Sequence, residues 1–463
     1  MLTGCPAPCE GAGCGALYPR ASIGIFRAED LDFADVDALS PALATNGADA
    51  DGFDWAVLGV DSGLLLGIPA ADQVRWHDGA SLLRGGALTA VLPGGGTGER
   101  FGAAVALGEG IDGGTRLIVG APARDAGPTL SAVGAVFLYE GADASLAGAT
   151  APQIVVGEHA EDHFGEGVWA CGDLDADGLA DWAATAPWAS PGAAALAGSL
   201  SVALSATMPA TLASSADLPQ LFGGGDGARF GDAVSCSTSL DDDAFPELVV
   251  AAPYASGIAR NGAGAVSIWT SPVDVAADPA LVLSGSEPGA NFGSAIAVGD
   301  LDGDGLSELV VGAPGADGGS GDDDATGAVM VYAGSDLRAR LESEGILATP
   351  GPARTLRGEF ARGNFGAAVH IADLDGDGVN DLVVGAPGTN STGLASATRA
   401  GAATVWRGPY TAWPTTQFMS GAPTTVAADR QYLETGSVLA TTDVDGDTML
   451  ELVLLTRIAR EDP

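Results

Sequence analysis

The stretch Asn291–Gly315, NFGSAIAVGDLDGDGLSELVVGAPG, contains an FG pair, an alternating apolar segment, an Asp-rich loop, a second apolar segment and Gly-Ala-Pro. The stretch Asn364–Gly388, NFGAAVHIADLDGDGVNDLVVGAPG, repeats the same elements in the same order. Period-two alternation bounded by Gly predicts two short strands joined by the Asp-rich loop. Self-similarity over a fixed period predicts a repeat architecture.

Weaker copies of this unit begin at Arg100, His163 and Arg229. A copy from Thr435 keeps the loop but lacks the Phe and the Gly-Ala-Pro, and we assign the most degenerate copy to the segment from Leu39. The alignment predicts seven units, roughly 60 to 70 residues apart. It places one Asp of each unit at an equivalent loop position: Asp51, Asp112, Asp177, Asp243, Asp304, Asp377 and Asp447.

A second element follows most copies of Gly-Ala-Pro after a loop of variable length. It consists of Gly-Ala and alternating apolar residues that end in an aromatic, as in GAVFLYEG from Gly134 and GAVMVYAG from Gly327. Another short apolar segment comes next, as in PQIVVGE from Pro152. Each unit therefore predicts about four antiparallel strands, which is one propeller blade. The predicted fold class is all-β, a seven-bladed β-propeller.

Closure of the ring is predicted from both ends of the sequence. The seventh unit lacks its third strand after Leu455, whereas ASIGIFRAED from Ala21 matches GAVFLYEGAD from Gly134 in register. We expect the last blade to combine two C-terminal strands with two N-terminal strands, a 2+2 clasp that removes open sheet edges. Residues 21–463 would then form one propeller, and residues 1–20 a Cys-containing tail or tether.

These FG pairs, Asp-rich loops and Gly-Ala-Pro segments resemble the FG-GAP repeats of integrin α-subunit heads, from about Ala21 to Ile458. The resemblance implies a β-propeller that binds and displays rather than catalyses. Integrins continue into leg domains and pair with a β-subunit, and nothing in this sequence matches those parts. Their partnering and signalling are therefore not carried over.

The Asp-rich loops are candidate calcium sites. Asp300, Asp302 and Asp304 lie at alternate loop positions, and the carbonyl of Leu306 and the carboxylate of Glu308 can close an oxygen cage. Crowded hard oxygen ligands suit Ca²⁺ better than a transition metal. Three further sets make about four ions in total: Asp173, Asp175, Asp177, Leu179 and Asp181; Asp373, Asp375, Asp377, Val379 and Asp381; Asp443, Asp445, Asp447, Met449 and Glu451. The alternative is that these acids are solvated turn residues.

Other loops depart from the pattern. The set Ser239, Asp241, Asp243 and Glu247 offers a hydroxyl in place of one carboxylate and is a weaker, fifth candidate. Arg116 stands where a closing acid belongs, so a guanidinium paired with Asp112 is expected to replace the ion. Thr448 stands where Gly is expected, which alters the loop geometry of the set from Asp443, although that set is kept as a calcium site. The loop with Asp49 and Asp51 is shortened, and no metal is predicted at that loop.

Composition limits the function classes. The formal net charge is -41, and every basic residue apart from His is Arg, which argues against nucleic acid as a partner. A hydrophobic content of 46% allows a buried core, and 70 Gly with 26 Pro indicate many tight turns. No apolar run approaches the roughly 20 residues that span a bilayer. We expect a monomer without a transmembrane segment.

The N-terminal segment holds three of the five Cys, and no secretion signal precedes them in the given sequence. Leu2-Thr3-Gly4-Cys5 resembles the lipobox of bacterial lipoproteins, which predicts a lipid tether at Cys5 if the natural start lies upstream. Cys9 and Cys14 would then be left to pair. The alternative is a disulfide-bearing tail. Both interpretations favour an extracellular or cell-surface location, including that of an outer-membrane lipoprotein.

Enzyme signatures are absent from the sequence: it has no HExxH, GxSxG, CxxC pair or P-loop. His159 and His163 could bind a transition metal with Glu158 and Asp162, but His163 occupies the position before an FG pair, which favours a structural role. Two further assignments are structural: Cys171 and Cys236 as buried thiols rather than a catalytic pair, and Phe292 and Phe365 as packing residues.

The loops that follow Gly-Ala-Pro differ most between units, and loops carry function. Trp188, Tyr254, Arg124 and Arg260 lie in or next to these loops and are the candidate partner-binding residues, because aromatics and Arg dominate interface hot spots. The first function hypothesis is a non-catalytic adhesion or protein-binding module, with a protein or surface glycan ligand on the face opposite the calcium loops. The alternative is a propeller hydrolase or lyase. Acids, His and Arg lining the central channel would favour the enzyme, and an apolar channel with aromatic-bearing loops on one rim would favour binding.

Overall fold

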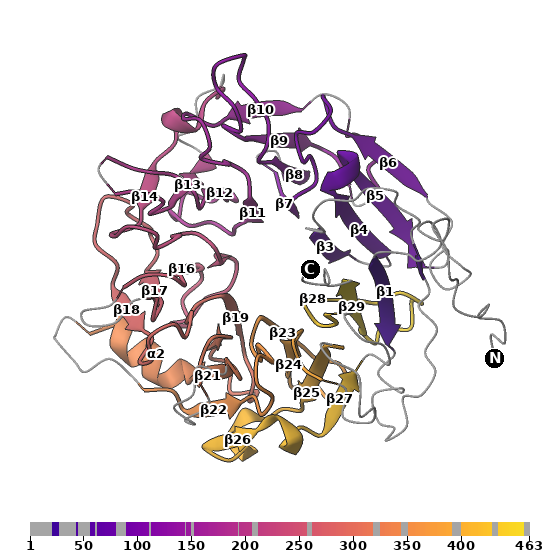
Figure 1. Ribbon diagram of the computed structural model, residues 1–463, viewed down its shortest axis with the longest axis vertical. Helices are drawn as coiled ribbons and strands as arrows, with labels where there is room; N and C mark the ends of the chain where they lie inside the picture. The colour runs from indigo at the N-terminus through magenta and orange to yellow at the C-terminus, as the bar shows by residue number, and fades with distance from the viewer. Residues whose placement is uncertain are drawn as a thin grey trace, which may run out of the picture.

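The computed structural model describes residues 21–26, 43–44, 56–60, 63–79, 89–110, 113–143, 145–149, 152–192, 194–205, 212–256, 262–317, 325–343, 351–390, 400–427 and 434–457. Sheets of short antiparallel strands are arranged in a ring around a central axis (Figure 1). The helical elements that the structure describes in full are α2 (Gly334–Leu341) and the short 3₁₀ segments η2 (Pro69–Ala71), η4 (Ser215–Asp217), η5 (Tyr410–Ala412) and η6 (Met419–Gly421). The prediction of an all-β propeller is confirmed.

Six of the sheets are built from strands that lie close together in the sequence, each beginning with the innermost strand. Their strands are β3 (Ala56–Val60), β4 (Gly63–Ile68), β5 (Gln73–Asp78) and β6 (Ala90–Pro93); β7 (Val105–Glu109), β8 (Thr115–Ala121), β9 (Ala135–Glu140) and β10 (Gln153–Val156); β11 (Gly167–Ala170), β12 (Trp182–Ala186), β13 (Ser199–Ala203) and β14 (Gln220–Phe222); β15 (Val234–Ser235), β16 (Leu248–Ala252), β17 (Ala265–Trp269) and β18 (Leu281–Ser284); β19 (Ala295–Gly299), β20 (Glu308–Ala313), β21 (Ala328–Tyr332) and β22 (Arg354–Arg357), joined by β26 (Thr416–Phe418); and β23 (Ala368–Ala372), β24 (Asp381–Ala386), β25 (Ala402–Trp406) and β27 (Thr424–Ala427).

The remaining sheet combines both ends of the sequence, in the order β2 (Leu43–Ala44), β1 (Ala21–Phe26), β29 (Glu451–Arg457) and β28 (Val438–Thr442). Strand β1 runs antiparallel to β29 along its whole length, from Ala21 opposite Arg457 to Phe26 opposite Leu452. The predicted pairing of the segment from Ala21 with the segment from Glu451 is confirmed.

The alignment of the segment from Leu39 is wrong. Leu43 and Ala44 form the outer strand of the closing sheet, and the next sheet begins with β3 as its innermost strand. The segment GLLLGIPA from Gly63, rather than the segment before it, takes the place of the second strand and Gly-Ala-Pro of the other units. The stretch that holds Asp49 and Asp51 therefore precedes an innermost strand instead of following one; these two residues lie outside the described ranges.

Several seams between sheets contain an FG pair. Phe292 is 1% exposed, and it forms an isolated parallel bridge with Gly264, which precedes the third strand of the preceding sheet. A Cβ on Gly264 would lie 2.1 Å from the carbonyl oxygen of Phe292, so only Gly allows this approach. Gly327 and Phe365 repeat the contact at the next seam. The packing role predicted for Phe292 and Phe365 is confirmed.

The clasp generates a prediction. Removing residues 1–20 leaves β1 in place and should leave the melting temperature nearly unchanged. Removing residues 1–30 deletes β1, exposes the hydrogen-bonding edge of β29 and should cause aggregation. Thermal melting and light scattering on both truncated chains check this. A fully folded, monomeric chain lacking residues 1–30 would contradict the clasp.

Candidate functional site

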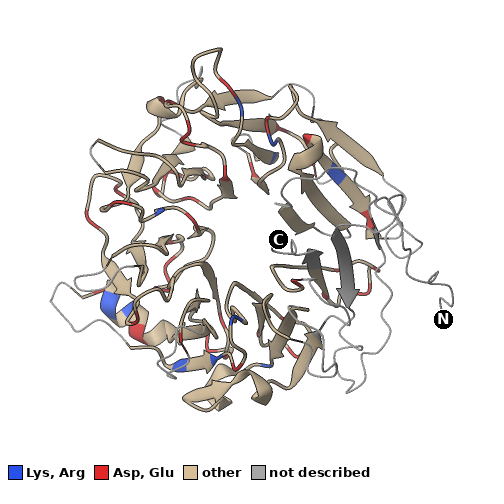
Figure 2. Ribbon diagram, viewed as in Figure 1, with Lys and Arg blue, Asp and Glu red and all other residues tan. Residues whose placement is uncertain are grey.

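The acidic loops join the first and second strands of their sheets. Five of them bring three acidic side chains together, with one potential ligand atom from each within 4.8 Å of the others. The five groups are Asp173, Asp175 and Asp181; Asp241, Asp243 and Glu247; Asp300, Asp302 and Asp304; Asp373, Asp375 and Asp377; and Asp443, Asp445 and Glu451. Figure 2 shows acidic residues recurring on connections around the ring, with few basic residues between them. In each of the four predicted sets and in the weaker fifth set, three of the predicted acidic residues therefore lie close together.

The four loops that begin with Asp are held by that first carboxylate. Asp300 Oδ1 accepts a hydrogen bond from the backbone N–H of Gly303 (2.7 Å), and its Oδ2 accepts one from Gly305 (2.9 Å). Asp304 Oδ1 accepts a hydrogen bond from the N–H of Leu306 (2.8 Å). The loop from Asp373 repeats all three contacts. The Asp-Gly spacing of the sequence thus supplies contacts that hold the loop from within.

The closing acids are buried at the base of the loops. Glu308 is 1% exposed; its Oε2 accepts a hydrogen bond from Leu301 N–H (2.8 Å) and its Oε1 one from Gly334 N–H (3.0 Å). Burial raises the pKa of Glu308 to about 7, and the charges of Asp302 and Asp304 also act upward. Burial likewise raises the pKa values of Asp181 and Asp381 to about 6. A buried carboxylate among other carboxylates calls for a proton or a cation.

Two buried carboxylate oxygens test whether a cation fits these loops. Glu247 is fully buried, and its Oε1 has no hydrogen-bond partner; Asp175 Oδ1 is also buried without one. Burial raises the pKa of Glu247 to about 7. Unsatisfied anionic oxygens, with only oxygen donors around them, match the ligand chemistry of a hard divalent cation. The residues therefore fit such an ion.

Two arginines near the loops were missed by sequence reasoning. Arg407 Nη1 lies 2.7 Å from Asp375 Oδ2, inside the loop from Asp373. Arg338 Nη1 lies 3.1 Å from Asp242 Oδ2, at the edge of the weaker loop. Arg407 directly follows the aromatic end of a third strand, and this position after the strand was the available signal. Both guanidinium groups offset part of the acidic charge of the loop that they contact.

Arg116 occupies the strand position of a closing acid. It lies opposite Gly108 in the β7–β8 pair, as Glu308 lies opposite Gly299 in the β19–β20 pair. Arg116 is 1% exposed, and its Nε donates to Glu140 Oε1 at 2.6 Å. The expected partner Asp112 lies outside the described residues. In this sheet a buried guanidinium, paired with a carboxylate from the third strand, stands in the closing position.

His159 and His163 face different acidic side chains. His159 is 69% exposed, with Nδ1 3.4 Å from Asp162 and Nε2 3.7 Å from Glu158, so different ring nitrogens face different acids. His163 turns toward Glu166 and Trp188 instead.

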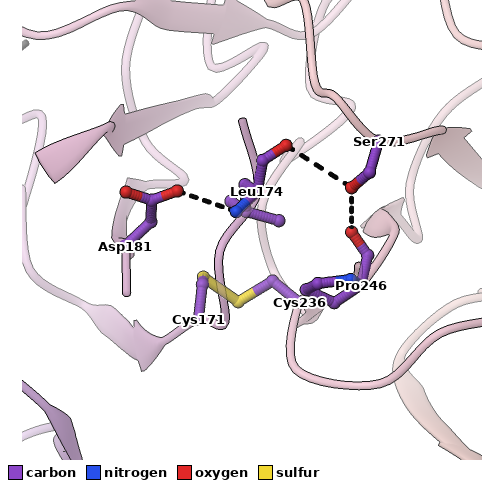
Figure 3. Close-up of a disulfide and its surroundings, with 6 residues drawn as sticks. All are labelled: Cys171, Leu174, Asp181, Cys236, Pro246 and Ser271. Atoms are coloured by element: carbon purple, nitrogen blue, oxygen red, sulfur yellow. Dashed lines mark hydrogen bonds between the residues drawn. A yellow bond between two sulfur atoms is a disulfide. The ribbon is translucent and has the colours of Figure 1, made fainter. Parts of the chain in front are cut away.

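Cys171 and Cys236 are bonded to each other as a disulfide (Figure 3), so the expectation of buried free thiols is wrong although their burial is confirmed. The two residues belong to different sheets, and sequence reasoning had no measure of the distance between their sulfurs.

At the opposite ends of the inner strands, two predicted partner-binding residues come together around an arginine. The guanidinium carbon of Arg229 lies 3.9 Å from the ring centroid of Trp188 and 5.0 Å from that of Tyr254. Tyr254 is 41% exposed. Arg124 instead pairs with Glu99 (3.4 Å), and Arg260 lies outside the described residues.

Charged groups continue this surface. Arg100 Nη1 lies 3.1 Å from Glu166 Oε2, and His163 Nδ1 lies 3.8 Å from the same oxygen. Burial acts to raise the pKa of Glu166, but the nearby His163 and Arg100 side chains outweigh it, so the pKa is lowered. We name this group the rim cluster; its members are Arg100, His163, Glu166, Trp188, Arg229 and Tyr254.

Sequence reasoning missed Arg100, Glu166 and Arg229 as members of the rim cluster. Arg100, His163 and Arg229 each precede an FG pair and share a left-handed backbone, with φ between 52° and 58°. For Glu166 and Arg229, the available signal was a charged residue before or just after FG in a unit whose loop after the second strand carries an aromatic; the unit of Arg100 has no such aromatic.

Comparison with known proteins agrees with this geometry. The FG-GAP repeat family model matches residues 292–332 and 365–406, so the chain carries FG-GAP repeats. The phosphatidylinositol-glycan-specific phospholipase D of Rattus norvegicus is 39% identical over 162 residues, covering 33% of this chain and 18% of the relative. Integrin alpha-5 of Xenopus laevis is 31% identical over 195 residues, covering 39% and 17%. Integrin alpha-IIb of Homo sapiens is 35% identical over 117 residues, covering 25% and 10%.

The matched part of the chain spans less than a fifth of the length of these relatives. Over the described ranges, no helix has the length and apolar character needed to cross a bilayer.

The loop from Asp443 generates a prediction. Thr448 has φ 76°, where Gly178, Gly305 and Gly378 have φ between 88° and 90°. A β-branched residue is strained in this region, so Thr448→Gly should raise the free energy of unfolding by about 1 kcal/mol. Urea denaturation of the calcium-free chain measures it. Gly305→Thr is the reverse control and should destabilise; a less stable Thr448→Gly chain would contradict the strain.

Proposed function

We propose, from the premise that the chain carries FG-GAP repeats, that it is an extracellular, calcium-loaded, seven-bladed propeller that acts as a non-catalytic binding module. The observation that carries the calcium assignment is the recurrence of one oxygen-donor loop at the same place in successive sheets. Three acidic groups that include a buried closing acid and two groups of three loop aspartates occur at equivalent connections. We assign about four ions to the loops predicted from the sequence, with the loop from Ser239 as a weaker fifth.

The seven blades in this proposal are the six sheets of neighbouring strands and the closing sheet of β1, β2, β28 and β29. Residues 21–463 would then be one domain, with residues 1–20 as a tail or a lipid tether at Cys5. A ring closed by pairing leaves no free inner edge, so each blade is supported on both sides. Monomeric behaviour is part of the same proposal.

The partner-binding face in this proposal is the rim cluster, at the end of the inner strands opposite the acidic loops. Inner-strand segments such as AIAVG (β19) and VLATT (β28) carry small or apolar side chains, which supports binding over catalysis in the channel. Aromatic side chains and Arg at one rim are typical of interface hot spots. The ligand would be a protein or a surface glycan.

The disulfide supports the extracellular assignment. The buried disulfide of Cys171 and Cys236 is of the kind that forms and persists outside the cytosol. The absence of Lys and the charge of -41 also keep the surface unattractive to anionic nucleic acid.

A hydrolase or lyase is the second candidate function. The observation that favours it is the grouping of Glu166, His163 and Arg100 at the rim, because acid, His and Arg are the residue types of general acid–base catalysis. One of the relatives named above is itself called a phospholipase D, although the matched region is a small part of it.

Calcium removal tests the first part of the proposal. With millimolar calcium and a dissociation constant of about 10 μM, each ion contributes about 2.7 kcal/mol to stability. Excess chelator should therefore lower the melting temperature substantially, and Asp304→Ala should lower it by less than full chelation does. An unchanged melting curve in chelator would exclude the calcium assignment.

Arg116→Met is the matched control for that measurement. It removes the ion pair with Glu140 from a sheet to which we assign no ion. Stability should fall, while the number of calcium equivalents bound, measured by calorimetric titration, stays the same. Loss of one equivalent would show that the loops are assigned wrongly.

The rim cluster is tested by a second set of variants. Arg229→Ala breaks the stack with Trp188 and Tyr254 and should weaken retention on glycan arrays and on immobilised surface-protein extracts by at least about tenfold. Phe222→Ala, at an exposed side chain of β14, should have no effect. If the chain turned over glycan or ester substrates and Glu166→Gln abolished that turnover, the enzyme hypothesis would replace the binding-module hypothesis.

A further inference from the structure

The disulfide of Cys171 and Cys236 crosses the seam between two neighbouring sheets. Cys171 directly follows β11 and Cys236 directly follows β15, and both are buried (5% and 2% exposed). We propose that this disulfide is a positioning clamp. It holds the acidic loop 173–181 against the neighbouring loop 239–247 and so raises the metal affinity of loop 173–181. The inference rests on the proposed calcium-binding function.

The clamp occupies a recurring contact of the ring. The seventh residue after the FG Phe of one sheet faces the sixth residue after the FG Phe of the next. A Cβ on Gly108 would lie 2.4 Å from Ala170 Cβ, and a Cβ on Gly299 would lie 3.0 Å from Ile371 Cγ2. Cys171 and Cys236 hold these same two positions. The seam therefore brings paired side chains into contact, and here the pair is two cysteines.

The clamp is continuous with loop 173–181 on its own sheet. Cys171 N–H donates to the carbonyl oxygen of Asp181 (2.9 Å), and the next residue, Gly172, donates to the carbonyl oxygen of Cys236 (3.0 Å). Asp181 is the closing acid, and its Oδ2 accepts a hydrogen bond from Leu174 N–H (2.8 Å). A shift of Cys171 would move the closing acid and the start of the loop together.

The neighbouring sheet also reaches loop 173–181. Ser271 Oγ lies within hydrogen-bonding distance of the carbonyl oxygens of Pro246 (2.5 Å) and Leu174 (3.4 Å), as Figure 3 shows. Val273 N–H donates to the same Leu174 oxygen (2.7 Å). The disulfide thus belongs to a connected unit that spans both loops.

The loop on the far side of the clamp has an incomplete ligand set. Ser239 stands in place of a carboxylate, and Glu247 Oε1 is buried without a hydrogen-bond partner. At the seam of loops 300–308 and 373–381, both loops carry full sets of acids. That seam has the backbone contact from Tyr410 N–H to Leu301 O (3.0 Å) and the pair Gly299 and Ile371, but no disulfide. The covalent bond therefore lies where the neighbouring loop is least able to be organised by an ion of its own.

The test replaces the clamp by the pair that another seam already uses. The variant C171G/C236A installs the Gly and Ala found at Gly108 and Ala170, so the seam keeps a pair that the ring accommodates. Calcium is titrated calorimetrically into the full chain after metal removal. Groups that orient metal ligands commonly change affinity by 10- to 100-fold, so one class of site should weaken about tenfold while the others are unchanged.

A second background identifies the affected site. The variant D175N/D177N removes two carboxylates of loop 173–181, and adding C171G/C236A to it should then change no remaining affinity. Reduction of the parent chain breaks the disulfide without any substitution at the seam. A dithiol passes two electrons and two protons to the two sulfurs and is itself oxidised to a disulfide, and the reduced chain should match C171G/C236A.

Calcium affinities that are identical with and without the disulfide would overturn the clamp while leaving the calcium function standing. Equal weakening of every site would also overturn it, because the disulfide would then support only global stability. A parent chain that binds no calcium at all would instead overturn the proposed function, and the clamp with it.

Discussion

The close approach of the FG pair to the preceding sheet is the contact on which the rest of the ring depends. Gly264 and Phe292 meet backbone to backbone, and the Phe ring is buried in a core shared by both sheets, with Val266 on one side and Leu309 on the other. A four-stranded sheet has two faces to cover and cannot cover either by itself. Each seam covers one face of each of the two sheets that it joins. A large side chain in place of Gly264 would therefore push the two sheets apart, and its effect would not be confined to one strand.

The same seams place the two functional ends of the molecule. In the five sheets that carry an FG pair, the inner strand begins just after that pair and leads into the loop before the second strand, so the buried Phe sets where both ends of the strand lie. Residues before and after FG, such as Arg229 and Glu166, are gathered at one rim. The carboxylates are gathered at the other end, where burial of Glu308 and its equivalents makes charge compensation necessary.

Equivalent positions around the ring use different chemistry. Most loops close with a buried carboxylate, whereas one sheet closes with Arg116 and Glu140. One seam adds a covalent bond between residues that are 65 apart in the sequence. In the chain-entropy model, closing a loop of that length stabilises the fold by about 4 kcal/mol. The contacts at the seams hold the backbone of the ring in place. Individual positions can therefore carry a carboxylate, an ion pair or a disulfide without changing the fold.

The sequence by itself determined most of the strands, their order and the acidic loops, because alternation, Asp-Gly spacing and Gly-Ala-Pro are local patterns. It also determined the closing pair of β1 and β29, because the last unit lacks a third strand and the segment from Ala21 supplies one. It was misleading from Leu39 onward, where those local patterns are too degenerate to register the strands. Only the tertiary structure decided the disulfide of Cys171 and Cys236, the stacking of Arg229 on Trp188 and Tyr254, and the pairing of Arg407 with Asp375. Each of these contacts joins side chains that are far apart in the sequence or lie in different sheets. The distance between the two side chains depends on how the strands and sheets pack, and a local sequence pattern contains no information about that packing.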